Sequence, residues 1–185
     1  TPAYEKWKKE QEEARRRAEE QRRQWEAAEK ARIEQEKKKA EEEAQRAARA
    51  AEEQKKQAVA NIALVKDFYT RFKEAYEERN DSRVMSMISD AWQAGDGTTL
   101  SDLQMTLRRT FKTFDEIRYN IQNLSITPLQ NGRYRVSYDV TITSRIYKRN
   151  LKHEEKSSIN EEVTIDGSGK AKISKTLGGR FWYVQ

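Results

Sequence analysis

Residues 133–147, RYRVSYDVTITSRIY, alternate apolar and polar side chains over almost their whole length. A period of two places the apolar residues on one face of a β-strand. The predicted inner face comprises Tyr134, Val136, Tyr138, Val140, Ile142 and Ile146. Just before this strand, Asn131-Gly132 is the strongest short-range hairpin signal. A two-residue loop there makes residues 117–126 an antiparallel partner strand, with Ile121 opposite Ile142.

Two further strands are expected at 159–165 and 171–177, joined by the loop Gly167-Ser168-Gly169. The register that sets their apolar faces together also places Glu161 opposite Lys175 on that face. The sequence therefore predicts a carboxylate and an ammonium group paired across two strands inside the sheet. The aromatic segment at 181–184, FWYV, ends this strand or follows it closely.

Upstream of the strands, the apolar period is that of a helix. The stretch IALVKDFYTRFKEAYEERN, residues 62–80, repeats apolar side chains every three or four positions. A second, short helix is expected at 82–92, where Val84, Ile88 and Trp92 recur at the same spacing.

A third helix is expected at 99–114, TLSDLQMTLRRTFKTF, with Thr99 and Asp102 as a capping box. Three helices followed by four antiparallel strands predict an α+β domain over residues 58–185, the head, with a curved sheet wrapped on its helices.

Residues 1–57, the stalk, carry 17 basic and 15 acidic residues and almost no large apolar ones. Ala, Glu, Lys, Arg and Gln are the best helix formers, so we expect one uninterrupted helix, roughly 80 Å long at 1.5 Å per residue. Acid-to-base pairs one turn apart support it locally. Faint Ala-lined seams leave two alternatives, a solvated spacer or a weak coiled coil. Trp7 and Trp25 share one face and are the candidate partner-binding residues of the stalk.

The head resembles the nuclear transport factor 2-like superfamily in the order and length of its elements, in the helices IALVKDFYTRFKEAYEERN and TLSDLQMTLRRTFKTF, and in the aromatic end RFWYV. The resemblance implies a cone-shaped α+β fold. It leaves the activity open, because the superfamily includes isomerases and cyclases as well as proteins that only bind or scaffold. The stalk, in stretches such as KKKAEEEAQRAARAAEEQKK, resembles the spanning helix of the A protein of the bacterial Tol-Pal system, which favours an envelope protein.

The amino-acid composition limits the kinds of functional site and partner to be expected of this chain. The chain has no Cys and one His, which excludes thiolate chemistry and makes a His-rich metal site or a His-based triad improbable, so we expect no metal and no cofactor. The net charge of +6 is spread along the chain, so we expect no nucleic-acid partner. No stretch is long and apolar enough to insert in a membrane. We expect a periplasmic or envelope-anchored protein, with the cytoplasm as the alternative.

Any pocket in the cone would involve the polar and aromatic residues of its inner face. The candidates are Glu161, Lys175, Tyr119, Tyr138, Trp92 and Tyr183. Three roles for Glu161 stay open: a catalytic base, a ligand-anchoring pair with Lys175, or a structural ion pair. A paired Glu has a lowered pKa and is a poorer base than an isolated one.

The first functional hypothesis is a non-enzymatic interaction or scaffold protein, which associates through the stalk or through an outer sheet face bearing Leu124 and Ile126. The rival is a small-molecule binding protein or isomerase-like enzyme. An open apolar cavity of about 300 Å³ or more with Glu161 in its wall favours the rival. A cone filled by its aromatic side chains favours the scaffold; these are Phe72, Trp92, Phe111 and Trp182.

Overall fold

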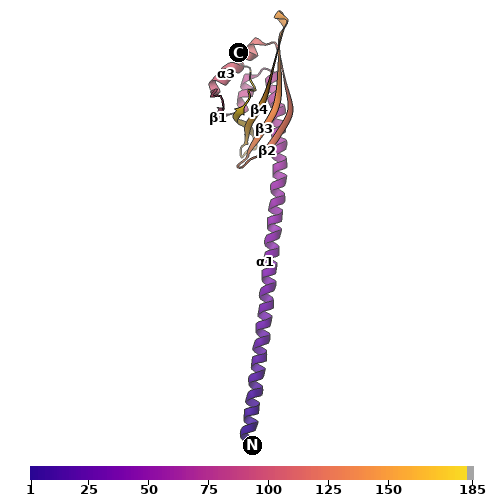
Figure 1. Cartoon of the computed structure of the whole chain (residues 1–185), viewed down its shortest axis with the longest axis vertical. Helices are drawn as coiled ribbons and strands as arrows, with labels where there is room; N and C mark the ends of the chain where they lie inside the picture. Colours follow the sequence, from indigo (N-terminus) through magenta and orange to yellow (C-terminus); the bar gives the residue numbers. More distant parts are fainter. Residues whose placement is uncertain (183–185) are drawn as a thin grey trace. The chain divides into compact units, whose positions relative to one another are not determined.

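A computed structural model describes residues 1–182 of the chain (Figure 1). In chain order its elements are α1 (Pro2–Glu77), α2 (Asp81–Ser86), β1 (Ile88–Ala94), α3 (Leu100–Thr113), β2 (Glu116–Pro128), β3 (Arg133–Ile146), the 3-10 helix η1 (Tyr147–Arg149), β4 (Leu151–Ile165) and β5 (Ala171–Gly178). The chain divides into two compact units, Thr1–Lys55 and Lys56–Gln185, and from here on the names stalk and head denote these two units instead of the expected ranges 1–57 and 58–185.

The stalk is helical and solvated. Every residue of Thr1–Lys55 is exposed except Glu29, which is half-buried. Ion pairs one turn apart run along it, such as Glu19 with Arg23 at 2.9 Å and Glu13 with Arg17 at 3.7 Å. Within the stalk, helix formation is therefore supported by intrinsic propensity and local pairs rather than by a buried apolar stripe.

The dependence of helicity on salt concentration tests whether local ion pairs stabilise the stalk helix. We expect a peptide of residues 3–57 to be helical at low ionic strength and measurably less helical in 1 M salt, because screening weakens its i,i+4 ion pairs. Circular dichroism at low and high salt measures this loss of helicity. The same measurement at several peptide concentrations distinguishes a solvated spacer from a coiled coil. Helicity that rises with concentration would indicate the coiled coil, and a peptide disordered at low salt would contradict the spacer.

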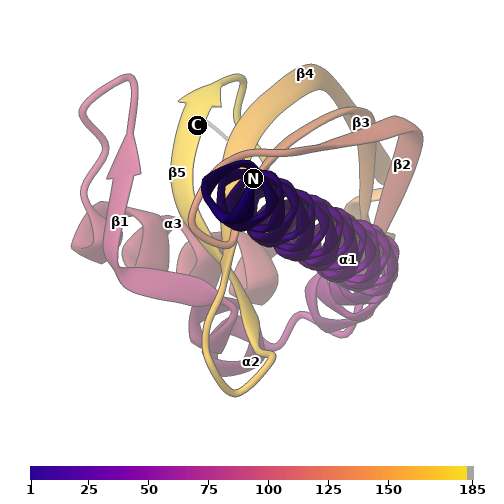
Figure 2. The ribbon, with the colours of Figure 1, turned by 90° about the horizontal axis from the view of Figure 1, so that it is seen from below.

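The head contains a five-stranded sheet in the order β1-β5-β4-β3-β2. Figure 2 shows β1 beside β5 at one edge of the curved sheet and β2 at the other. All pairings are antiparallel except that of β1 with β5. The prediction of an α+β head is confirmed, but the sheet has one strand more than expected.

The extra strand occupies the second half of the expected helix at 82–92. Helix α2 ends at Ser86, and Ile88–Ala94 forms β1. A spacing of four residues, as between Ile88 and Trp92, keeps two side chains on one face of a helix and also on one face of a strand. The edge of β5 decides between them, because it offers unpaired backbone groups: the Ile173 N–H donates to the Met87 carbonyl over 3.0 Å.

The β2–β3 hairpin is formed, but its register differs from the prediction. Ile121 lies opposite Val140 rather than Ile142. The turn is longer than two residues, since the Leu129 N–H donates to the Arg133 carbonyl over 2.8 Å. Because the shift in this part of the hairpin is by two residues, the inner face remains the same.

A β-bulge in β2 corrects the expected outer dimer surface. The register of β2 shifts between Gln122 and Ser125, where Asn123 adopts a left-handed φ of 55°. The extra residue turns the following side chains over, so that Ile126 lies opposite Val136. Leu124 and Ile126 pack against the core and form no outer apolar patch.

The core joins one face of each long helix to the inner face of the sheet. From α1 it takes Val65, Phe68, Tyr69, Phe72, Ala75 and Tyr76. From α3 it takes Leu103, Leu107, Thr110 and Phe111, behind the capping box of Thr99 and Asp102 that the sequence predicts. Within residues 1–182, no helix combines the length and apolar character that a membrane crossing requires.

Candidate functional site

The register of β4 against β5 places Glu161. Near the turn the pairing is the predicted one, with Val163 opposite Ile173. Ser174 is then an extra residue in β5, so Glu162 lies opposite Lys175 and Glu161 lies opposite Thr176. Opposite residues of an antiparallel pair share a face, so the bulge moves Lys175 to the outer face. The predicted Glu161–Lys175 pair is therefore wrong.

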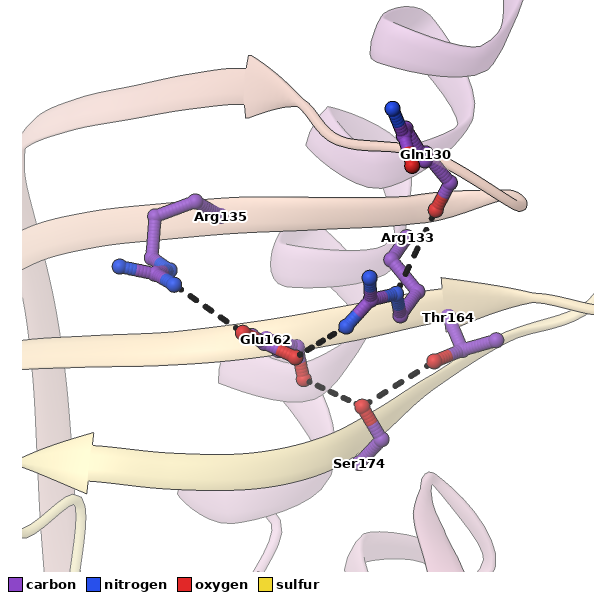
Figure 3. Close-up of polar contacts among 6 residues, drawn as sticks. All are labelled: Gln130, Arg133, Arg135, Glu162, Thr164 and Ser174. Atoms are coloured by element: carbon purple, nitrogen blue, oxygen red, sulfur yellow. Dashed lines mark hydrogen bonds and ion pairs between the residues drawn. The ribbon is translucent and has the colours of Figure 1, made fainter.

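On the outer face of the sheet, two arginine side chains contact the carboxylate of the neighbouring residue, Glu162. Figure 3 shows Arg133 and Arg135 pointing toward Glu162, with N–O distances of 3.6 and 3.0 Å. The hydroxyl of the bulged Ser174 donates to the Glu162 carbonyl over 3.1 Å, and the Thr164 hydroxyl bonds to Ser174 over 3.1 Å. The bulged Ser174 thus keeps hydrogen-bond partners. The carboxylate of Glu162 is paired with arginine side chains on the outer face, whereas that of Glu161 lies on the inner face, away from them.

Glu161 itself is fully buried on the inner face. Its Oε1 accepts hydrogen bonds from the hydroxyl of Tyr69 in α1 and from that of Tyr138 over 3.2 Å. Its Oε2 accepts a long bond of 3.5 Å from the Thr176 hydroxyl. None of these donors carries a charge.

Two more of the predicted residues extend this network. The hydroxyls of Tyr119 and Tyr138 lie 3.3 Å apart, and the indole N–H of Trp92 donates to the Thr176 hydroxyl over 3.1 Å. Helix α1 and strands β1 to β5 all contribute to the surroundings of the one carboxyl group.

Burial raises the pKa of Glu161 from its ordinary value of 4.5 to about 7, against the lowering effect of its hydrogen bonds from Tyr69, Tyr138 and Thr176. Burial also raises the pKa values of Tyr69 and Tyr138 well above 10, and the nearby Glu161 charge adds to the shift. The tyrosines therefore stay protonated as donors, while the carboxyl group exists in both protonation states near neutral pH. Such a group can accept and return a proton.

A cavity of about 600 Å³ lies next to this network. Its wall consists of residues 94–96 at the end of β1, Glu155 and Ser157 of β4, residues 176–178 of β5, and Gly179, Arg180 and Trp182. Glu161 is absent from this wall. Thr176 lines the cavity and also contacts the Glu161 carboxyl group, so the carboxyl lies one hydrogen bond away from the cavity.

Of the two criteria set from the sequence, the structure meets the one for a filled cone. The aromatic side chains named for a filled cone are all buried: Phe72, Trp92, Phe111 and Trp182. The cavity reaches the required volume of about 300 Å³, but its wall is largely polar and lacks Glu161, so the criterion of an open apolar cavity with Glu161 in its wall is not met.

The structure gathers Glu161, Tyr119, Tyr138 and Trp92, and it places Lys175 on the opposite face. Tyr183 lies outside the described residues. Sequence analysis missed Tyr69 and Thr176. Tyr69 lies four residues after Val65 on the buried stripe of α1, a spacing that was available as a signal; Thr176 reaches the inner face only because of the bulge.

No protein-family model and no curated protein matches the chain. Solved structures do match the head, among them a scytalone dehydratase-like protein from Novosphingobium aromaticivorans, at 12% identity and a TM-score of 0.59, over 69% of this chain and 91% of that one. A nuclear transport factor 2-like superfamily protein from Salmonella enterica matches at 9% identity and a TM-score of 0.55, over 66% of this chain and 92% of the other. The head has the nuclear transport factor 2-like fold.

Another nuclear transport factor 2-like match is the hexachlorocyclohexane dehydrochlorinase LinA-type3 from Novosphingobium barchaimii, at 19% identity and a TM-score of 0.53, over 69% of this chain and 89% of that one. Proteins named for eliminations on small molecules thus stand among the matches of the nuclear transport factor 2-like head. This corrects the first functional hypothesis: the preference for a non-enzymatic scaffold is wrong, and the small-molecule alternative is the better supported one.

Proposed function

We propose that the head is a small-molecule enzyme of the proton-transfer class, an isomerase or lyase, with Glu161 as its base. The observation that carries the proposal is a fully buried carboxyl group that has no cationic partner within residues 1–182, that has a pKa near 7, and that lies one hydrogen bond from a cavity. An ideal general base has its pKa near the working pH. The bulge at Ser174 removes the sequence-based objection that Lys175 would keep this carboxyl ionised.

In the proposed first step, the Glu161 carboxylate takes a proton from a carbon atom of the ligand. In an isomerisation the electron pair left on carbon is delocalised onto a carbonyl oxygen as an enolate, and the carboxylic acid returns the proton to another carbon. In an elimination the pair forms a double bond while the leaving group departs with its bonding electrons. Tyr69 and Tyr138 hold the carboxyl oxygen and fix its orientation.

Thr176 controls access to the base. A ligand in the cavity meets the Thr176 hydroxyl before it meets Glu161. It reaches the carboxyl group once this side chain rotates, which breaks the hydrogen bond from Trp92. The similarity to proteins named as a dehydrochlorinase and as scytalone dehydratase-like supports an elimination as one form of this chemistry.

Two simple probes share one product. Isomerisation of the β,γ-unsaturated cyclohexenone and dehydration of β-hydroxycyclohexanone both give the conjugated enone, which ultraviolet absorbance detects. We expect the full chain to accelerate at least one of these reactions, with a rate that rises as the pH passes 7. Glu161→Gln should lower the rate by about 100-fold or more, because the amide cannot accept the proton.

Glu162→Gln is the matched control, since it makes the same change one residue away on the outer face and should keep the activity once folding is verified. A Glu161→Gln protein that retains the wild-type rate would overturn the assignment. Failure of both probes to react or to bind would count against the cavity as a substrate site.

For the stalk we propose association with a helix of another protein or of a second copy, or a role as a spacer. The exposure of Trp7 at 55% and of Trp25 at 67% supports the first. The likeness to the Tol-Pal A spanning helix makes an envelope location part of this proposal. Sedimentation of the full chain with and without Trp7→Ala and Trp25→Ala tests self-association.

A further inference from the structure

The cavity wall contains a charged pair whose arrangement bears on the choice of ligand. Arg180 Nε donates to Asp96 Oδ2 over 2.9 Å, and both residues line the cavity. Their side chains are 40% and 31% exposed, so the pair lies toward the solvent side of the wall. The other acidic residue of this wall is Glu155, and Arg180 is its one basic residue among residues 1–182.

The backbone holds Arg180 in place. Gly179 has a φ of +73°, and a Cβ at this position would lie 2.1 Å from the Ser158 carbonyl oxygen. Only glycine allows the chain to pass so close to β4. The next backbone N–H, that of Arg180, donates to the Ser157 hydroxyl over 3.1 Å. The backbone of Arg180 is therefore fixed before any ligand arrives.

Asp96 is fixed independently of Arg180. Its Oδ1 accepts the Thr98 backbone N–H over 2.9 Å. Hydrogen bonds from Thr98 lower the pKa of Asp96, and the hydrogen bond and charge of Arg180 lower it further. Asp96 is thus ionised at neutral pH and holds a negative charge beside the guanidinium.

This arrangement disfavours an anion in the cavity. The positive charge of Arg180 is balanced by Asp96, and Glu155 adds a further acidic side chain to the wall. A carboxylate ligand would have to displace Asp96 or accept its repulsion. A neutral ligand meets no such cost: within the described residues the terminal nitrogens of Arg180 make no other hydrogen bond, so they can donate to a carbonyl or hydroxyl oxygen.

We propose that Asp96 is a specificity-determining residue, which sets the cavity for neutral ligands that carry hydroxyl or carbonyl groups and excludes carboxylates. This inference rests on the proposed function in taking the cavity as the substrate site. It narrows the substrate of the proposed enzyme to uncharged hydroxy or carbonyl compounds.

Benzamide and benzoate form a suitable probe pair, because they have the same shape and differ in charge. Ligand-observed NMR titration of the full chain should show binding of benzamide and at least tenfold weaker binding of benzoate. Asp96→Asn should raise the affinity for benzoate about tenfold and change that for benzamide little, because it frees Arg180 for a charge-assisted, bidentate contact. The asparagine keeps an oxygen to accept the Thr98 N–H, so the turn should stay intact.

The double variant Asp96→Asn with Arg180→Met should lose the gain in benzoate affinity. The inference fails if wild-type protein prefers benzoate, if Asp96→Asn leaves the ratio of the two affinities within about twofold of wild type, or if the gain survives the loss of Arg180. Lack of binding by both probes to every variant would overturn it as well.

The enone assay separates this inference from the proposed function. A charge preference that follows Asp96, together with activity that does not depend on Glu161, would leave the specificity residue standing and remove the base. Glu161-dependent turnover without the charge preference would do the opposite.

Discussion

Substitution of Gly179 by alanine is expected to destabilise the head by about 4 kcal/mol. The left-handed φ of +73° is costly for any residue with a Cβ. The added carbon would also lie 2.1 Å from a backbone carbonyl oxygen of β4, which cannot rotate away as a side chain could. The segment after β5 would have to move away from β4, and the cavity wall around Arg180 and Trp182 would move with it.

Urea denaturation followed by near-ultraviolet circular dichroism measures this loss. Gly169→Ala in the β4–β5 turn is the matched control: its φ is +79°, but nothing lies within 4 Å of the added carbon. The control should cost only about 1 kcal/mol, the conformational part of the effect. Equal losses in the two variants would show that the close approach to Ser158 contributes nothing.

The second large effect is a pH dependence of stability that Glu161 causes. Its pKa is about 7 in the folded head and near 4.5 in the unfolded chain, so between these values the unfolded chain binds fewer protons. Stability contributed by this group is therefore fully present below pH 4.5 and is lost as the pH rises through 7. At about 1.4 kcal/mol per pKa unit, the loss amounts to about 3 kcal/mol.

Glu161→Gln carries no titratable group at this site, so it should be more stable than wild type at pH 8 by up to about 3 kcal/mol, with the difference shrinking toward pH 4.5. Urea denaturation at a series of pH values measures it. Asp102→Asn serves as a control of opposite sign: hydrogen bonds from Thr99 lower the pKa of Asp102 from 3.8, so its contribution is lost as the pH falls through the acid range. Parallel stability curves for wild type and Glu161→Gln would contradict the raised pKa.

Much of the head could be predicted because its patterns are local. The alternation at 133–147 and the three-and-four spacing at 62–80 and 99–114 predict strand and helices that the structure contains. The Thr99 capping box needs only residues within one turn. The alternation of apolar side chains along each strand predicts that Tyr138 and Glu161 point to the inner face of the sheet, and both side chains are buried there.

The strand β1 is a segment whose secondary structure the local sequence pattern does not determine. Ile88 and Trp92 fit a helix and a strand equally well. The choice depends on the free edge of β5, which lies far along the chain and comes into place only in the folded head.

By itself, the sequence determined the helical stalk, the α+β class of the head and most of its apolar faces, because propensity and periodicity act over a few residues. Only the tertiary structure decided which partners those faces meet. One extra residue in β2 turns Leu124 and Ile126 into the core, and one in β5 replaces Lys175 by Thr176 beside Glu161. A bulge is set by the fit of neighbouring strands and by the curvature of the sheet, which no single segment encodes. The bulge in β5 makes the difference between an ion pair and a buried carboxyl group that can exchange a proton.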